Sequence, residues 1–239
     1  MCVIFAAAGF FAVRFPNVSG VEIGAVLSTL VIAAPAVVAL AHRFGVRRAA
    51  IAWASLAVLG YAVETIGLTT GFPYGEFYYG QRLGPQLPGG APLILPISWA
   101  PLVIGAVAAS EPRERGELSF LRRLGWVVAS AALLVAMDGV LDPGAAHLGY
   151  WVWPNGGAYY GVPASNYIGW AFSSLLASSV LIAVAPWRST RLVRGLSDSA
   201  LVSLAFWSSA ALFAGLWTPF VLGVTLLVYL VRRRSLRLA

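Results

Sequence analysis

The sequence predicts an all-α fold, a polytopic integral membrane helix bundle of seven or eight transmembrane helices. Of its 239 residues, 59% are hydrophobic and 10% are charged, and the mean hydropathy is +0.81. A soluble protein has no means of covering so much apolar surface. Apolar runs of roughly 18 to 20 residues, each able to cross about 30 Å of hydrocarbon, recur along the chain. We therefore expect a single transmembrane domain over residues 1–239.

The expected helices are separated by short segments rich in glycine, proline or charge. Pro219 marks the break between the last two, because one helix of their combined length would overshoot the bilayer. The first and the last helix are short. The expected ranges are 1–13, 22–41, 48–67, 93–110, 124–141, 166–186, 200–217 and 219–231.

The arginines predict the orientation of the chain. All sixteen basic residues are arginine, and most lie in alternate loops and in the C-terminal tail. Short cytoplasmic loops accumulate positive charge, so we expect these loops and both termini in the cytoplasm, with the protein in the cell membrane. No basic stretch has the motifs of a nucleic-acid-binding protein, so the net charge of +7 predicts no nucleic-acid partner. The arginines in question are Arg43, Arg47, Arg48, Arg113, Arg115, Arg122, Arg123, Arg188, Arg191, Arg194, Arg232, Arg233, Arg234 and Arg237.

The loops on the opposite side are rich in glycine, proline and aromatic residues. Residues 72–80 and 153–161 share the frame (Phe or Trp)-Pro-x-Gly-x-x-Tyr-Tyr-Gly, and each follows a helix that ends near a carboxylate. Both preceding helices are expected to run outward. The pattern therefore predicts a parallel repeat about an axis along the membrane normal, with a site between its two units.

Three carboxylates lie within or at the outer ends of apolar segments: Glu64, Asp138 and Asp142. A carboxylate in such a position is unfavourable and usually functional. Burial and the negative end of a helix dipole both favour the neutral acid, so we expect proton donors near neutral pH. Asp138 and Asp142 are four residues apart on one helical face, where they can share a proton. The structural alternative is that these acids hydrogen-bond broken helix ends or interhelical hydroxyls.

Aromatic residues are concentrated on the same side as these acids. Anchoring at the membrane interface explains most of them. We expect a minority to line a pocket and present ring faces to a developing carbocation. Asn155 and Asn166 are candidates for holding a water molecule, with turn and capping roles as alternatives. His147 has no partner at ligand spacing and Cys2 is the single cysteine, so no metal site is expected.

Several motifs lie between about residues 60 and 170: Glu64 to Gly67, Thr70 to Gly75, Pro96 to Trp99, Asp138 to Pro143, Trp151 to Trp153, and Tyr159 to Pro163 with Asn166 to Trp170. As a set they resemble the CruF-type carotenoid 1,2-hydratases, a family that includes gamma-carotene and bisanhydrobacterioruberin hydratases. The likeness extends over the rest of the chain through its hydropathy. The short first helix departs from the family pattern.

The resemblance implies a hydro-lyase without a cofactor, which adds water across the terminal C1=C2 bond of an acyclic carotenoid psi end group. A carboxylic acid protonates the alkene and water captures the tertiary carbocation. Asp138 or Asp142 is the expected donor, and Glu64 is expected to position water and accept its proton. The residues expected to bind substrate are Tyr74, Tyr78, Tyr79, Trp99, Trp153, Tyr159, Tyr160, Asn166 and Trp170.

The carotenoid is expected to enter from the lipid bilayer, and other carotenoid-pathway enzymes are candidate partners. A lycopene cyclase, or another enzyme that modifies carotenoid end groups, begins with the same protonation and remains an alternative. A proton-coupled transporter would use the same acids as a relay, but it would also need polar groups that reach the cytoplasmic side. A prenyltransferase is disfavoured because the sequence has no acidic cluster suited to Mg²⁺ and diphosphate.

Overall fold

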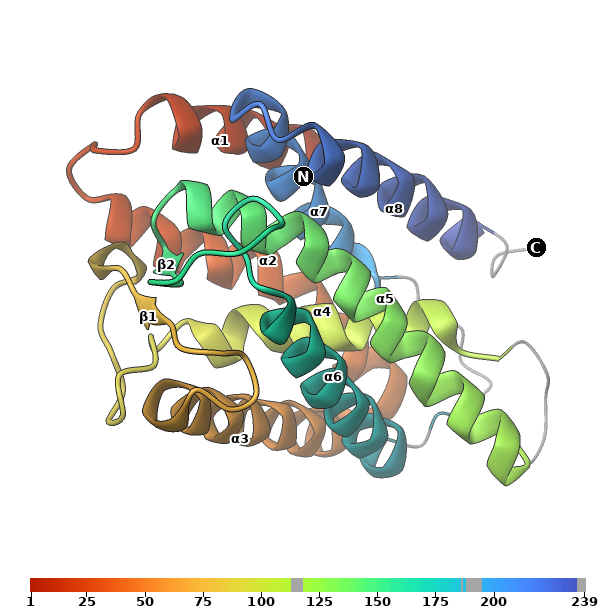
Figure 1. Ribbon diagram of the computed structural model, residues 1–239. Coiled ribbons are helices and arrows are strands. Elements are labelled where there is room, and N and C mark those ends of the chain that lie inside the picture. The colour runs from red at the N-terminus through yellow and green to blue at the C-terminus, as the bar shows by residue number, and fades with distance from the viewer. Residues whose placement is uncertain (113–117, 186, 188–194, 236–239) are drawn as a thin grey trace.

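A computed structural model describes residues 1–112, 118–185, 187 and 195–235, and it is built from helices (Figure 1). Arg113, Arg115, Arg188, Arg191, Arg194 and Arg237 lie outside these described residues. The elements are α1 (Cys2–Arg14), α2 (Val21–Phe44), α3 (Val46–Thr70), β1 (Tyr78–Tyr79), η1 (Gln81–Leu83), α4 (Leu95–Ser110), α5 (Phe120–His147), β2 (Trp151–Val152), α6 (Ala164–Val184), α7 (Asp198–Phe213) and α8 (Trp217–Ser235). The predicted all-α class is confirmed, and the break between α7 and α8 falls at 214–216, just before Pro219.

The helices have the length and composition of membrane spans. Within the described residues, α2, α3, α5 and α6 are long and apolar enough to cross a bilayer, whereas α1, α4 and α7 are shorter apolar helices. Large apolar side chains such as Ile4, Phe120 and Ile168 point outward and are 70% or more exposed. Such a surface is unfavourable in water and suited to lipid. The protein is therefore a helical membrane protein.

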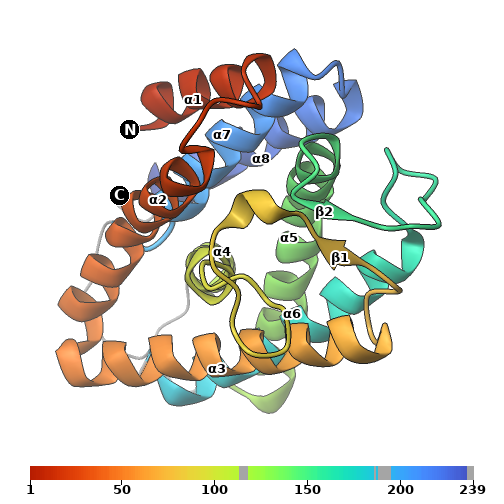
Figure 2. The same cartoon turned by 90° about the vertical axis from the view of Figure 1, so that its left-hand side faces the viewer.

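Helix α4 forms the centre of the bundle. Figure 2 looks along it and shows α2, α3, α5, α6 and α7 arranged around it. Every residue from Ala100 to Ala109 is buried, and most are small. At Gly105 an added Cβ would lie 2.6 Å from the Cβ of Ala200 on α7, so the two helices approach closely only because this position is glycine.

Helix α5 is longer than the sequence predicts. The expected end at residue 141 is wrong, because the helix continues through Pro143 to His147. Proline lacks the N–H that would bond to the carbonyl four residues earlier, that of Gly139. The hydroxyl of Tyr159 donates to this carbonyl at 3.1 Å. Asp142 thus lies inside the helix rather than at its end, and burial rather than a helix terminus determines its surroundings.

Two short strands join the two aromatic-rich loops. β1 and β2 pair antiparallel, with Tyr78 opposite Val152 and Tyr79 opposite Trp151. The backbones approach closely next to the strands, where the N–H of Gly80 donates to the carbonyl of Tyr150 at 2.8 Å. We refer to the end of the bundle that carries β1 and β2 as the ladder end. The opposite end, where α2, α4 and α8 finish and α3 and α5 begin, is the arginine end (Figure 1).

A buried ion pair holds three helices together at the arginine end. The guanidinium of Arg43 on α2 bonds both carboxylate oxygens of Glu111, which follows α4, and it also bonds the carbonyl of Trp187. Arg233 on α8 donates to the carbonyls of Ala109 and Glu111. The side chains of Arg43 and Glu111 are only 4% and 14% exposed. Because both side chains are buried, water has little access to either one if the other is removed.

Replacing Arg43 by alanine is expected to lower the free energy of unfolding in detergent micelles by about 3–5 kcal/mol, because the buried carboxylate of Glu111 loses both of its bonds to the guanidinium. Arg47→Ala is the matched control, since Arg47 is exposed near the same end. Denaturant titration of the purified proteins measures the difference. Equal stability of Arg43→Ala and Arg47→Ala would show that the pair does not stabilise the bundle.

Candidate functional site

Asp138, Asp142 and Asn166 form a buried polar cluster near the ladder end. The two aspartates are one turn apart on α5, and Asn166 lies in the first turn of α6. Their exposed fractions are 0%, 2% and 3%. The amide Nδ2 of Asn166 donates to Oδ2 of Asp138 at 3.2 Å and to Oδ2 of Asp142 at 2.5 Å. One amide thus holds both carboxyl groups together.

The two carboxyl groups also contact each other. Asp138 and Asp142 are within hydrogen-bond reach, and such a bond requires a proton on one of them. The indole N–H of Trp151 is directed to Asp142 as a further donor. Oδ1 of Asp138 is buried and receives no N–H or O–H donor from the described residues. A buried carboxylate oxygen without a donor is more unfavourable when it is charged than when the acid is neutral.

Glu64 faces this cluster from α3 and is only half-buried. The hydroxyl of Tyr79 on β1 donates to Oε2 of Glu64 at 2.8 Å. Burial raises the pKa of the Tyr79 hydroxyl well above its usual range, and the neighbouring Glu64 carboxylate raises it further. Tyr79 therefore remains a neutral donor at any physiological pH.

Tyr74 lies close to Glu64 and to both aspartates. It is 7% exposed, and its hydroxyl bonds the side chain of Ser173 on α6. Burial raises the pKa of Tyr74, and the nearby carboxyl groups of Glu64, Asp138 and Asp142 raise it further. The ring packs directly on α6 because residue 169 is glycine, where an added Cβ would lie 2.5 Å from a carbon of the ring.

A small cavity adjoins Glu64. It is lined by Gly60, Val63, Glu64, Tyr74, Leu95, Pro96 and Trp99. The space open to the centre of a water-sized sphere is about 10 Å³, which is roughly what one water molecule occupies. Gly60 makes room for Trp99, because a Cβ there would lie 2.8 Å from its indole ring. Glu64 thus forms part of the wall of a space the size of one water molecule.

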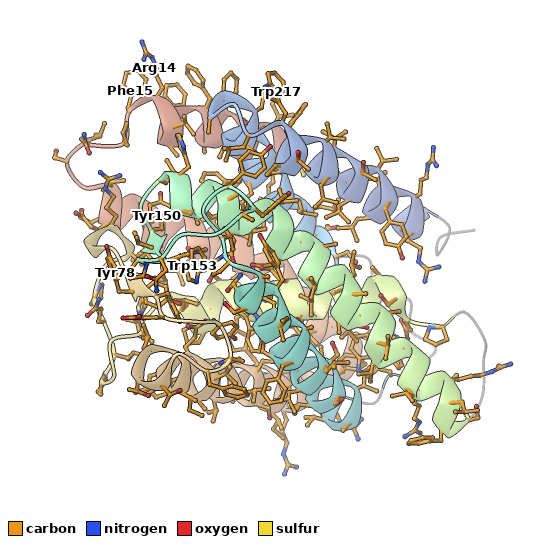
Figure 3. The ribbon with its side chains drawn as sticks, in the orientation of Figure 1. Arg14, Phe15, Tyr78, Tyr150, Trp153 and Trp217 are labelled. Atoms are coloured by element: carbon orange, nitrogen blue, oxygen red, sulfur yellow. The ribbon has the colours of Figure 1, made fainter. Side chains whose placement is uncertain are left out.

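Aromatic and aliphatic side chains cover the cluster at the ladder end. Tyr74, Phe77 and Trp153 pack with Val63 and Val162 in a second core, separate from that around α4. The rings of Phe77 and Trp153 lie 6.4 Å apart, and the indole N–H of Trp153 has no partner among the described residues. Figure 3 shows Trp153 and Tyr78 at this end of the bundle. This core separates the carboxyl groups from bulk water.

The structure brings together most, but not all, of the residues that the sequence singles out. Glu64, Asp138, Asp142, Asn166, Tyr74, Tyr79, Trp99 and Trp153 lie in or around the site, and Trp170 packs partly buried against both cores. Tyr78 is 53% exposed on the other face of β1. Tyr160 is exposed and bonds Thr218 on α8, whereas Tyr159 bonds the carbonyl of Gly139.

Two residues near the acids were missing from the site that the sequence predicts. Trp151 is among the aromatic residues of the expected interface, and its N–H is directed to Asp142. Tyr167 lies close to both aspartates, and its buried hydroxyl has no partner among the described residues. The motif Trp151 to Trp153 was the available signal for Trp151, and the motif Asn166 to Trp170 contains Tyr167.

Among the described residues, no group of three or more His, Cys, Asp or Glu side chains is placed to hold a metal ion. The acids are instead arranged as a hydrogen-bonded pair and a third carboxylate with its own tyrosine donor. Such a set suits proton transfer.

This membrane bundle, with its buried acids at one end, belongs to the carotenoid biosynthesis protein family, whose model matches residues 20–230. Among curated proteins, the chain is similar to the bisanhydrobacterioruberin hydratase of Haloarcula japonica, with 39% identity over 133 residues. The matched part is 55% of this chain and 44% of that relative, so the chain spans less than half of the relative's length. No solved structure matches the chain.

Proposed function

We propose that the protein is a carotenoid hydratase, which adds water to the terminal C1=C2 bond of an acyclic psi end group and forms a tertiary alcohol. The family and the name of the relative support the class of reaction. The observation that carries the proposal is the hydrogen-bonded carboxyl pair of Asp138 and Asp142, set opposite Glu64 and its water-sized cavity. Alkene hydration needs an acid, a water molecule and a base, and these residues can supply them.

Asp138 is the proposed proton donor. Two N–H groups, from Asn166 and Trp151, are directed at Asp142. Among the described residues, Asp138 receives only the longer N–H contact from Asn166. Donors favour the ionised form of a carboxyl group. The proton that the pair shares is therefore expected on Asp138, with Asp142 as its acceptor. The proton moves to C2 of the alkene, which leaves the positive charge on the tertiary carbon C1.

Glu64 is the proposed base. Glu64 lines the cavity and its carboxylate is held by Tyr79. A water molecule in the cavity that donates to this carboxylate would keep a lone pair free for the cation. As the new C–O bond forms, Glu64 takes a proton from the water. Each turnover removes one proton from the aspartate pair and leaves one on Glu64. Tyr74, near all three acids, is the proposed route for its return.

Aromatic rings are proposed to protect the cation until water reaches it. Trp99 and Tyr74 line the cavity beside Glu64, and an aromatic face attracts positive charge by up to about 2 kcal/mol when desolvated. Other nucleophiles are excluded by the apolar core over the site. We further propose that the ladder end faces away from the cytoplasm and that the carotenoid reaches it laterally from the bilayer, with residues 1–239 acting as one domain of the cell membrane.

Expression of the chain in a lycopene-producing host tests the function. The extracted carotenoids are expected to gain the mass of one water molecule for each converted end, as measured by mass spectrometry. The Asp138→Asn variant and a host without the gene serve as controls. A cyclic product of unchanged mass would instead identify a cyclase, and an unaltered carotenoid pool would contradict the proposed activity on this substrate.

A further inference from the structure

The two strands of the ladder connect the acids of two different helices. Tyr79 and Trp151 are directly opposite each other in the register of β1 and β2, and their rings meet edge to face with centroids 6.1 Å apart. The hydroxyl of Tyr79 reaches Glu64 on α3. The indole N–H of Trp151 is directed to Asp142 on α5. A single cross-strand pair therefore touches both sides of the site.

We propose that Tyr79 and Trp151 are a positioning pair, which sets the separation between Glu64 and Asp142 and gives each of them a neutral donor. The proposal rests on the hydration reaction proposed above. Neither residue touches the reacting carbons in this scheme. Each acts through the carboxyl group that it holds.

The ladder is well suited to this role because its geometry leaves little freedom. Opposite side chains in an antiparallel pair have Cβ atoms about 4.5–5.5 Å apart, so the two donors keep a fixed spacing. The strands continue into a close backbone approach, where a Cβ at Gly80 would lie 2.2 Å from the carbonyl oxygen of Gly149. Helices α3 and α5 each pack against α4 and α6, and the ladder adds a further link between them (Figure 2).

The polar groups of Tyr79 and Trp151 can be removed while an aromatic ring is kept at each position. Tyr79→Phe deletes one hydroxyl, and Trp151→Phe deletes the indole N–H while keeping an aromatic ring against Tyr79. Tyr229→Phe is the matched control, because it removes the same hydroxyl from a tyrosine of α8 that is 40% exposed. Thermal unfolding in detergent is measured for all variants, so that loss of fold is separated from loss of positioning.

The test is hydration of a psi-end carotenoid in proteoliposomes, with kcat and KM determined separately. Tyr79→Phe and Trp151→Phe are each expected to lower kcat about 10-fold to 100-fold, since small misplacement of catalytic groups has effects of this size, and to leave KM almost unchanged. The double variant is expected to lose less than the product of the two single effects, because the residues act as one unit. Tyr229→Phe is expected to match the wild type.

The products give a second readout. Tyr79→Phe is expected to raise the share of isomers of unchanged mass, because the cation then loses a proton before water captures it. Trp151→Phe is expected to lower total conversion without changing that share. If the wild type hydrates and both variants match Tyr229→Phe, the positioning pair is refuted while the function stands. If the wild type does not hydrate at all, the proposed function itself has failed.

Discussion

Asp138→Asn is expected to lower the rate of hydration by roughly 10²–10⁴-fold, the usual contribution of a positioned general acid. An amide has nearly the shape of the carboxyl group but no proton of comparable acidity to give to an alkene. Asp142→Asn is expected to have an effect of the same order, because it removes the partner that accepts the proton of Asp138 and holds it in place. Rates are measured by liquid chromatography of carotenoids converted in proteoliposomes.

The control for both variants is Glu22→Gln, which changes an exposed carboxyl group at the same end of the bundle. It is expected to retain full activity. The Asp138→Asn protein is expected to remain folded, since Asn166 can still hydrogen-bond a carbonyl oxygen at that position. Wild-type rates in both aspartate variants would show that neither aspartate is the proton donor.

Glu64→Gln is expected to lower hydration by a similar factor of roughly 10²–10⁴, but with a different set of products. The aspartate pair can still protonate the alkene in this variant, whereas the water in the cavity lacks a base. The cation is then expected to lose a proton from a neighbouring carbon, or to react with an internal double bond. Isomers with the mass of the substrate therefore accumulate, and they are measured by chromatography with mass detection.

The comparison of Glu64→Gln with Asp138→Asn separates the two roles. Asp138→Asn is expected to return unchanged substrate, because no cation forms. The appearance of isomers in Asp138→Asn rather than in Glu64→Gln would reverse the assignment of acid and base. A Glu64→Gln protein that hydrates at the wild-type rate would exclude Glu64 from the reaction.

Much of the fold follows from features local in the sequence. Hydropathy and the positions of glycine and proline predict each α-helix of the described residues and approximate bounds for it, but not the short helix η1. The error at the end of α5 has a physical cause, because Pro143 normally marks a helix end and here does not. The hydrogen bond that satisfies the free carbonyl of Gly139 comes from Tyr159, sixteen residues beyond Pro143. Reasoning from local sequence has no access to such a contact.

The candidate site follows partly from the same reasoning. Acids are rare within apolar segments, so composition alone singles out Glu64, Asp138 and Asp142, and the helical repeat places the two aspartates on one face. The partners of these acids come from other elements. The pairing of β1 with β2 brings Tyr79 and Trp151 together, and nothing in the spacing of their residues along the chain predicts that register.

The repeated frame of residues 72–80 and 153–161 is a second case in which local sequence does not predict tertiary contacts. Equivalent tyrosines of the two loops have different surroundings, since Tyr79 bonds Glu64 whereas Tyr160 bonds Thr218. β1 lies within the first frame, and β2 precedes the second. Similar local sequences thus lie at one end of the bundle in different tertiary contexts. The partners of each loop, rather than its motif, determine what its side chains contact.

The source of the hydroxyl oxygen tests the account most directly. The purified protein is incubated under ordinary air with a psi-end carotenoid in water enriched in oxygen-18. The mass of the product is then determined by mass spectrometry. The account predicts that every new hydroxyl group carries the heavy isotope, because the cation made by Asp138 is captured by water. A product whose hydroxyl oxygen has the isotopic composition of air would contradict it.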